Sequence, residues 1–251
     1  MIAVEDHGDI AVVTLAHGKA NTLDIGFCEA IAARFDDLRT APAKAVVLTG
    51  QGRMFSAGVD LLRLSEGGAA YVRRFLPALH RLYSAVFFFP KPVVAAVNGH
   101  AIAGGCVLEC CADRRIAARD GGRIGVTELL VGVPFPPLAF EVMKFATPPR
   151  YLTDCMYSGA TFTPEVALAR GLVDDLADAS ALLDRAVAAA ETLAALSPQA
   201  FAQTKRQLRQ GVADAVERHG ARIDASSMEI WTADATLARI RAYVSKTFKK
   251  A

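Results

Sequence analysis

Apolar positions in the first two-thirds of the chain follow two different periods. Continuous apolar runs at Ile10–Leu15, residues 44–49 (KAVVLT) and residues 92–97 (PVVAAV) predict buried strands. Between these runs, apolar side chains recur three or four positions apart. This spacing predicts helices whose buried faces carry Phe27, Ile31, Phe35 and Leu38, and then Phe75, Leu79, Leu82 and Val86. Strands that alternate with helices favour parallel pairing, so the pattern predicts an α/β layer architecture.

Strand signals become sparse after Gly125. Residues 163–164 (TP) and 197–198 (SP) each place a capping hydroxyl before a proline, which predicts a helix start at both places. Gly171 is typical of a helix stop. The remaining chain is predicted to be helical, and its last helix presents one apolar face made of Leu237, Ile240, Tyr243 and Val244.

Composition is that of an ordinary globular protein. The 251 residues are 53% hydrophobic and 22% charged, which is enough for a sizeable core. The expected division is an α/β core over residues 1–190 and a helical C-terminal region over residues 191–251. The net charge of +2 predicts neither a nucleic acid nor an anionic membrane as partner, because phosphate binding needs clustered Lys and Arg.

No segment predicts a membrane span or a secretory signal. The longest apolar stretch, residues 86–97, is interrupted by a Pro-Lys-Pro sequence and falls short of the ~18 residues that a span needs. The first residues include acids where a signal peptide has a basic region, so we expect a cytoplasmic location.

The cysteines are odd in number and irregularly spaced, which favours reduced thiols over a disulfide framework. Cys106, Cys110 and Cys111 have neither a Cys-x2-Cys spacing nor a nearby histidine. Buried packing is therefore favoured over a metal site, and no metal is expected.

Two glycine-containing turns follow predicted strands. Residues 52–62 (GRMFSAGVDLL) come after the second strand, and residues 98–106 (NGHAIAGGC) come after the third and open a helix. Small residues let the main chain approach a ligand, and the free N–H groups at a helix start can donate to a developing oxyanion. Each turn alone is also typical of a tight strand-to-helix connection, but their combination and order are more specific.

An ordered set of short segments resembles the crotonase family, the enoyl-CoA hydratase/isomerase superfamily. The matching segments run from about residue 10 to residue 175. They are residues 19–23 (KANTL), 55–61 (FSAGVDL), 92–99 (PVVAAVNG), 103–106 (AGGC), 127–132 (TELLVG) and 167–174 (ALARGLVD).

This resemblance implies a crotonase-like spiral of ββα repeats with a helical C-terminal trimerisation region, and a homotrimer or hexamer. It also implies an acyl-CoA substrate, in which coenzyme A is part of the substrate and no separate cofactor is used. The thioester oxygen would lie between the main-chain N–H groups of Val59 and Gly104.

The residues that the resemblance places against coenzyme A are Lys19, Ala20, Asn21, Ala57, Val59, Asp60, Leu61 and Lys246. For Lys246 a second interpretation stays open. Together with Lys249 and Lys250 it also fits a solvated terminal tail, which is a common situation for lysines at the end of a chain.

The chain departs from the family pattern at one catalytic position. Relatives that hydrate enoyl-CoA use two glutamates, and the matching positions here are Val107 and Glu128. Glu109 lies two positions further on, about 200° around a helix from Val107, and is expected to miss the site. Cys110 and Cys111 share the face of Val107 one turn along, where a core position is expected.

One carboxylate suffices to move a double bond, because the same group can remove a proton and return it. The pattern therefore favours 3-enoyl-CoA to 2-enoyl-CoA isomerisation, with Glu128 as sole acid/base, partly buried and with a raised pKa. Two alternatives stay open: hydration or another crotonase-type reaction on an acyl-CoA, and a catalytically idle CoA-binding or RNA-binding relative. Residues 132–138 (GVPFPPL) fit an acyl-chain pocket or the edge of the core equally well.

Overall fold

Two sheets form the centre of the computed structural model, which describes residues 1–248. In the six-stranded sheet all neighbours are parallel except the first pair, and the order is β1 (Ile2–His7), β2 (Ile10–Leu15), β3 (Ala45–Gly50), β5 (Val93–Val97), β7 (Arg114–Ala118) and β9 (Asp175–Ala177). The smaller, parallel sheet has the order β4 (Met54–Ser56), β6 (His100–Ile102) and β8 (Ile124–Gly125).

The chain winds through these sheets as a spiral of ββα units. β3 and β4 are followed by α2 (Leu61–Phe87), and β5 and β6 are followed by α3 (Gly104–Cys110). Each of these two turns adds one strand to each sheet and then a helix, whereas β1 and β2, which precede α1, both belong to the six-stranded sheet. The predicted crotonase-like fold is confirmed.

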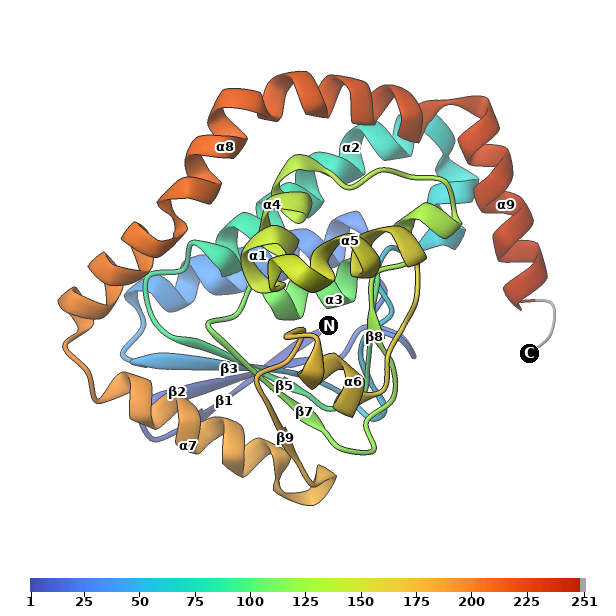
Figure 1. Cartoon of the computed structure of the whole chain (residues 1–251). Helices are drawn as coiled ribbons and strands as arrows, with labels where there is room; N and C mark the ends of the chain where they lie inside the picture. Colours follow the sequence, from blue (N-terminus) through green and yellow to red (C-terminus); the bar gives the residue numbers. More distant parts are fainter. Residues whose placement is uncertain (249–251) are drawn as a thin grey trace.

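Alternate side chains of the central strands enter two hydrophobic layers, one on each face of the sheet. In β3, Val46 and Leu48 enter the large core, which also contains the buried face of α1 (Ile25–Thr40), whereas Val47 faces the opposite layer under α7 (Leu182–Ala194). Figure 1 shows α7 on one side of the sheet and α1 to α5 on the other. Because the strands are buried on both faces, they read as continuous apolar runs in the sequence.

The later part of the chain is mostly helical. It contains η1 (Glu128–Leu130), α4 (Pro137–Ala146), α5 (Pro149–Ser158), α6 (Pro164–Ala169), η2 (Ala179–Ala181), α8 (Pro198–Thr232) and α9 (Asp234–Phe248). The predicted helix starts at Pro164 and Pro198 are confirmed, and the Ser197 hydroxyl accepts a hydrogen bond from the Ala200 N–H. The expected boundary at residue 190 falls inside α7.

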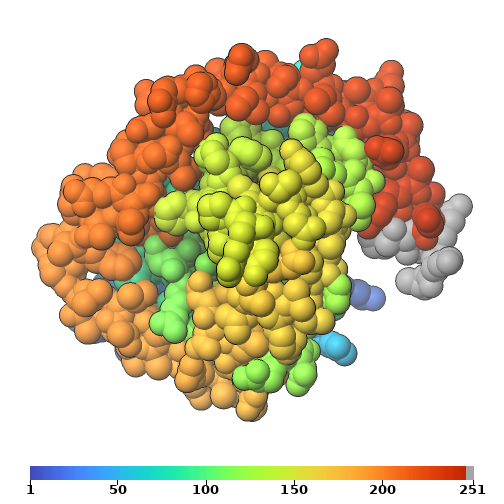
Figure 2. Space-filling model, viewed as in Figure 1, coloured from blue at the N-terminus to red at the C-terminus, as the bar shows by residue number. Residues whose placement is uncertain are grey.

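α8 and α9 form a band along the edge of the molecule, beside α4 and α5 (Figure 2). α9 buries Leu237, Ile240 and Val244 on one face, as predicted, and this face packs against α2. Across the part of the chain that the structure describes, none of the helices combines the length and the apolar character needed to cross a bilayer.

Candidate active site

The two glycine-containing turns lie against each other. Leu23 bridges to the first turn, since its N–H donates to the Gly58 carbonyl at 2.7 Å and its carbonyl accepts from the Asp60 N–H at 3.0 Å. A Cβ added at Gly58, where φ is +79°, would lie 2.6 Å from the Ile102 carbonyl oxygen and 2.9 Å from the Gly104 nitrogen. The turn after β4 can therefore touch the turn after β6 only because residue 58 is glycine.

The main-chain N–H groups of Val59 and Gly104 are both free within residues 1–248. Val59 does not donate in the Leu23 bridge, and Gly104 is the first residue of α3, where a helix has no internal acceptor for its N–H groups. Ala103 between the strand and the helix has a φ of 51°, an uncommon conformation for alanine that sets the direction of the Gly104 N–H. Val59 lines the cavity described below, whereas Gly104 directly follows the lining residue Ala103 and does not line the cavity itself.

A cavity of about 460 Å³ opens beside these turns, and its walls are mainly apolar. The residues that line it are Lys19, Ala20, Thr22, Ala57, Val59, Asp60, Leu61, Leu62, Ile102, Ala103, Thr127, Glu128, Val131, Val133, Trp231 and Tyr243. Its size and lining are those of a small-molecule site.

Glu128 is the buried acid of this cavity. It opens η1 and is 8% exposed, and its Oε2 atom has no hydrogen-bond partner in the part of the chain that the structure describes. Burial raises the pKa of Glu128 to about 7, because the charged form loses its hydration. A carboxyl group with a pKa near neutrality can both take up and release a proton.

The second glutamate position of the hydratases offers no acid here. Val107 is buried in α3 and is not on the cavity wall. Glu109 also stays off the wall: it is fully buried, and its Oε1 accepts from the Cys106 thiol at 3.6 Å. Burial raises the pKa of Glu109 well above its usual value.

Asp60 is the other carboxylate on the cavity wall, and it is held by local structure. It caps α2 by accepting from the Arg63 N–H at 3.0 Å, and it also accepts from the Thr22 hydroxyl at 3.3 Å. The Arg63 side chain lies 3.6 Å from its Oδ2 atom. These contacts favour a carboxylate with a structural role rather than a free acid.

The residues expected at coenzyme A are distributed as follows. Six of them line the cavity, namely Lys19, Ala20, Ala57, Val59, Asp60 and Leu61. Asn21 lies behind it, where its amide donates to the carbonyls of Leu15 and Phe55 at 3.0 and 3.1 Å and so supports the preceding turn. Lys246 is exposed near the end of α9 and does not line the cavity. Lys249 and Lys250 lie outside the described residues.

Two aromatic residues of the cavity were not among the predicted site residues. Trp231 comes from α8 and Tyr243 from α9. The indole N–H of Trp231 donates to the Pro134 carbonyl at 2.9 Å and thereby joins α8 to the loop of residues 132–138. Val133 of this loop lines the cavity, whereas Phe135 lines a neighbouring groove.

One group of side chains has the composition of a metal site. Cys106, Glu109 and Cys110 bring their potential ligand atoms within 4.8 Å of one another, all buried in α3. A metal requires deprotonated ligands. The hydrogen bond with Cys110 and burial raise the pKa of Cys106 well above normal, and burial does the same for Glu109, whereas the hydrogen bond with Cys106 lowers the pKa of Cys110. Cys106 and Glu109 are therefore favoured as neutral, packed side chains, and all five cysteines are buried and free, as predicted.

The geometry defines a class of protein first. It is a spiral α/β protein in which one residue with a free main-chain N–H group and one buried carboxyl group line an apolar cavity, with a second free N–H group next to the cavity wall. The family model for enoyl-CoA hydratase/isomerase matches residues 5–246. The chain therefore belongs to the enoyl-CoA hydratase/isomerase family and is an enzyme of the crotonase type.

Similar proteins carry both hydratase and isomerase names. A putative enoyl-CoA hydratase of Thermus thermophilus is 36% identical over 213 residues, which cover 83% of each chain. A probable enoyl-CoA hydratase of Mycobacterium tuberculosis superposes with a TM-score of 0.84 at 33% identity, covering 90% of this chain and 95% of that one. Another structure of the same protein, described there as an isomerase, has a TM-score of 0.78 at 32% identity, covering 96% and 97%. At 23% identity, human mitochondrial Δ3-Δ2-enoyl-CoA isomerase shares the fold, with a TM-score of 0.94 over 99% and 98% of the two chains.

Proposed function

We propose that this enzyme converts 3-enoyl-CoA to 2-enoyl-CoA by proton transfer through Glu128 alone. The observation that carries the proposal is the environment of Glu128, a buried carboxyl group with an unpartnered oxygen on the cavity wall. The position that matches the second glutamate of the hydratases is Val107, which cannot exchange a proton. Isomerisation needs one group that exchanges a proton, whereas hydration needs a second group to position and activate water.

The reaction assigns one role to each group. The Glu128 carboxylate removes a proton from carbon 2 of the substrate, and the C–H electron pair moves into a dienolate. The N–H groups of Val59 and Gly104 stabilise the negative thioester oxygen. Protonated Glu128 then returns its proton to carbon 4, and the double bond moves to carbons 2 and 3. No atom is gained or lost, and no water takes part.

Coenzyme A would enter as part of the substrate and no other cofactor is proposed. Lys19, Ala20, Ala57, Asp60 and Leu61 lie on the cavity wall beside the proposed thioester position, which supports their assignment to the coenzyme A part. The assignments of Asn21 and Lys246 to coenzyme A stay predictions, as does the cytoplasmic location.

Hydration is the second candidate, because relatives such as the T. thermophilus protein are named enoyl-CoA hydratases. It would require Glu128 to work with another group. Asp60 is the remaining carboxylate on the described cavity wall, and its oxygens already accept from Arg63 and Thr22. This environment favours isomerisation.

The two reactions are separated by supplying purified enzyme with 3-hexenoyl-CoA and 2-hexenoyl-CoA in separate assays. Isomerisation produces the conjugated thioester from the first substrate, with little consumption of the second. Hydration of 2-hexenoyl-CoA at a rate equal to or above isomerisation would overturn the proposal. A Val107→Glu variant that gains hydration would show that this position limits water addition.

We further propose that the chain assembles as a homotrimer or a hexamer. An apolar groove of about 390 Å³ lies between the α4–α5 region and α8. Exposed apolar side chains surround it, including Leu129, Phe140, Tyr157, Ile223 and Ile230. Clustered exposed apolar surface is typical of a protein interface.

A further inference from the structure

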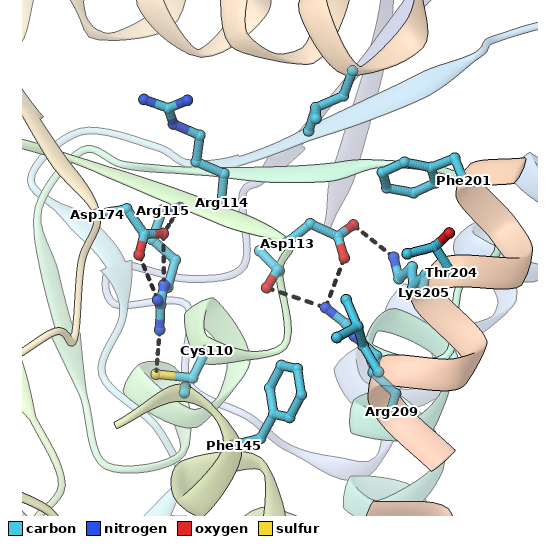
Figure 3. Close-up of a pocket in the computed structure, with 14 residues that line it drawn as sticks. Cys110, Asp113, Arg114, Arg115, Phe145, Asp174, Phe201, Thr204, Lys205 and Arg209 are labelled. Atoms are coloured by element: carbon cyan, nitrogen blue, oxygen red, sulfur yellow. Dashed lines mark hydrogen bonds and ion pairs between the residues drawn. The ribbon is translucent and has the colours of Figure 1, made fainter. Parts of the chain in front are cut away.

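A second cavity, of about 500 Å³, shares no residue with the active-site cavity. It lies between the first half of α8 and the segment that leads into β7 (Figure 3). Its apolar wall consists of aromatic and aliphatic side chains, chiefly Phe145, Leu193, Phe201 and Leu208. Its volume is within the range of cavities that hold small ligands.

One face of α8 supplies a mixed apolar and cationic wall. Phe201, Lys205 and Leu208 recur at helical spacing and all line the cavity, together with Thr204 and Arg209. Leu208 is 67% exposed although it forms part of this wall, so the cavity has an open side along α8. The face of α8 that lines this cavity therefore carries both apolar side chains and positive charge.

Buried cations outnumber carboxylates around this cavity. Asp113 forms ion pairs with two of these cations, Lys205 through Nζ at 2.6 Å and Arg209 at 2.7 Å (Figure 3). Asp174 receives the third, Arg115, through two hydrogen bonds at 2.6 and 3.0 Å to its two oxygens. Three buried cations thus face two carboxylates, which leaves one positive charge in surplus.

Neighbouring charged groups do not remove this surplus. Glu109 behind the cavity has a pKa raised well above normal by burial, which favours its neutral form. Arg114 at the edge of the cavity adds a fourth cation, 3.8 Å from Asp175, and Asp175 also pairs with Arg185. The hydrogen bond with Cys106 lowers the pKa of Cys110, burial opposes this, and Arg115, which donates to the sulfur at 3.9 Å, lowers the pKa further. The surplus of one positive charge requires this thiol to be protonated.

Lys205 has a donor to spare, whereas the terminal N–H groups of Arg209 are all occupied. The terminal N–H groups of Arg209 are taken by the carbonyls of Phe87, Cys111 and Ala112 and by Asp113. Lys205 Nζ donates to Asp113 and to the Lys91 carbonyl, and its third N–H has no acceptor within residues 1–248. Burial lowers the pKa of Lys205 to about 8, and the charge of Arg209 adds to this effect, whereas Asp113 opposes it.

We propose that this second cavity binds a monocarboxylate with an apolar chain. Its carboxylate accepts from the free N–H of Lys205 and neutralises the surplus charge, and its chain lies along Phe145, Phe201 and Leu208. A single surplus charge matches a monoanion, whereas inorganic phosphate would bring further negative charge and no apolar surface. The proposal is independent of the reaction catalysed at Glu128.

The test is calorimetric titration of the full-length enzyme with sodium octanoate, beside octanol and inorganic phosphate as probes. Saturable binding of octanoate, with octanol and phosphate at least about tenfold weaker, is expected, because a charge-assisted hydrogen bond and apolar burial must act together. The single tryptophan, Trp231, lines the active-site cavity, so its fluorescence reports whether octanoate binds there instead. It should stay unchanged while octanoate saturates the second cavity.

Variants locate the binding. Lys205→Met removes the donor, and Leu208→Glu places a competing carboxylate on the exposed wall without touching the buried ion pairs; each should weaken octanoate binding at least about tenfold. Arg206→Met removes an exposed cation of the same helix that does not line this cavity, and it should bind octanoate as the wild type does. Cys110→Ser cannot form a thiolate and should bind octanoate as the wild type does. Tighter binding by this variant would mean that a Cys110 thiolate already neutralises the surplus charge, and it would overturn the proposal.

Three further results of the titrations would overturn the proposal. The proposal fails if octanoate does not bind saturably, if it binds with the same affinity to Leu208→Glu, or if octanol binds as tightly as octanoate. Octanoate binding that changes the Trp231 fluorescence and is unaffected by both variants would place it in the active site. The ion pairs would then serve only to hold α8.

Discussion

The carboxyl group of Glu128 lies in surroundings that favour its neutral form, and this property affects both catalysis and stability. Burial removes hydration from the charged form, and no hydrogen bond replaces it at Oε2 within the described chain. The proposed reaction uses the ionised form as a base. The residue therefore combines an unfavourable buried charge with a proton affinity suited to neutral pH.

The pH dependence of the rate follows from this pKa. Below about 7 the protonated form of Glu128 predominates and cannot act as a base. We expect kcat/KM for 3-hexenoyl-CoA to be about tenfold lower at pH 6 than on its plateau above pH 7, because one pH unit below the pKa about a tenth of the base is ionised. Initial rates between pH 5.5 and 8.5 measure this, and a flat profile would contradict the assignment.

The same pKa predicts a stability effect. The pKa of Glu128 is raised in the folded state, so the folded protein binds this proton more tightly than the unfolded chain does. The contribution of Glu128 to the free energy of unfolding therefore falls as the pH rises from about 4.5 to about 7. Glu128→Gln removes this dependence and should stabilise the protein by up to about 3 kcal/mol at pH 8, and by much less at pH 5. Urea unfolding at the two pH values measures the difference; a variant less stable than the wild type at pH 8 would contradict the prediction.

Prediction of the site residues from the sequence depended on local motifs. Val59, Gly104 and Glu128 each lie in a short ordered segment, and the structure brings these segments to one cavity. Trp231 and Tyr243 reach the cavity from α8 and α9, which lie far away along the chain. No local pattern encodes how such helices dock, although a single tryptophan in a polar helix is a usable signal.

At the scale of elements, the site depends on the contact between the turn after β4 and the turn after β6. The atoms nearest to Gly58 across this contact are the Ile102 carbonyl oxygen and the Gly104 nitrogen. These are backbone atoms, so they cannot make room for a larger residue as the end of a flexible side chain can. A methyl group at residue 58 would push apart the two segments that carry the N–H donors.

Gly58→Ala should therefore reduce kcat by about 10²-fold or more, the usual effect of losing an oxyanion donor. Gly52→Ala is the matched control, because Gly52 also has a positive φ, of +65°, but a Cβ there meets nothing within 4 Å. The control should lose about 1 kcal/mol of stability from backbone strain and keep its kcat. Equal losses of kcat in both variants would contradict the role assigned to the contact.

Ion pairs with Asp113 anchor α8 to the rest of the fold. Asp113 accepts from Lys205, Arg209 and the Val93 N–H, and so links α8 to the start of β5. Asp113→Asn would leave two buried cations without their carboxylate and should cost about 3 kcal/mol of folding free energy in urea unfolding. Asp214→Asn on the outer face of α8 should change stability by less than about 0.5 kcal/mol, and a similar loss in both would contradict the anchoring role.

The elements that the sequence predicted are those with enough residues to show a period. The long strands β2, β3 and β5 and the helices α1 and α2 follow the expected patterns. The strands β4, β6 and β8 have only two or three residues each, too few for a period. β1 is polar and largely exposed as an edge strand, so it lacks the apolar run that marked the others.

At the scale of the whole molecule, apolar surface between the α4–α5 region and α8 is left uncovered in the single chain. A homotrimer or hexamer would bury it. Light scattering coupled to gel filtration should give three or six times the chain mass of 26.7 kDa. Ile223→Asp at the groove should shift the enzyme toward smaller species, and a wild-type enzyme that elutes as a monomer would contradict the proposal.

The most direct test of the proposed mechanism compares Glu128→Gln with Glu109→Gln on 3-hexenoyl-CoA. Both glutamates are buried, both have an unpartnered Oε2 in the described chain, and only Glu128 lines the active-site cavity. We predict a loss of kcat of about 10²-fold to 10⁴-fold for Glu128→Gln and wild-type turnover for Glu109→Gln. If Glu128→Gln keeps its turnover, a single-glutamate mechanism at this cavity is wrong.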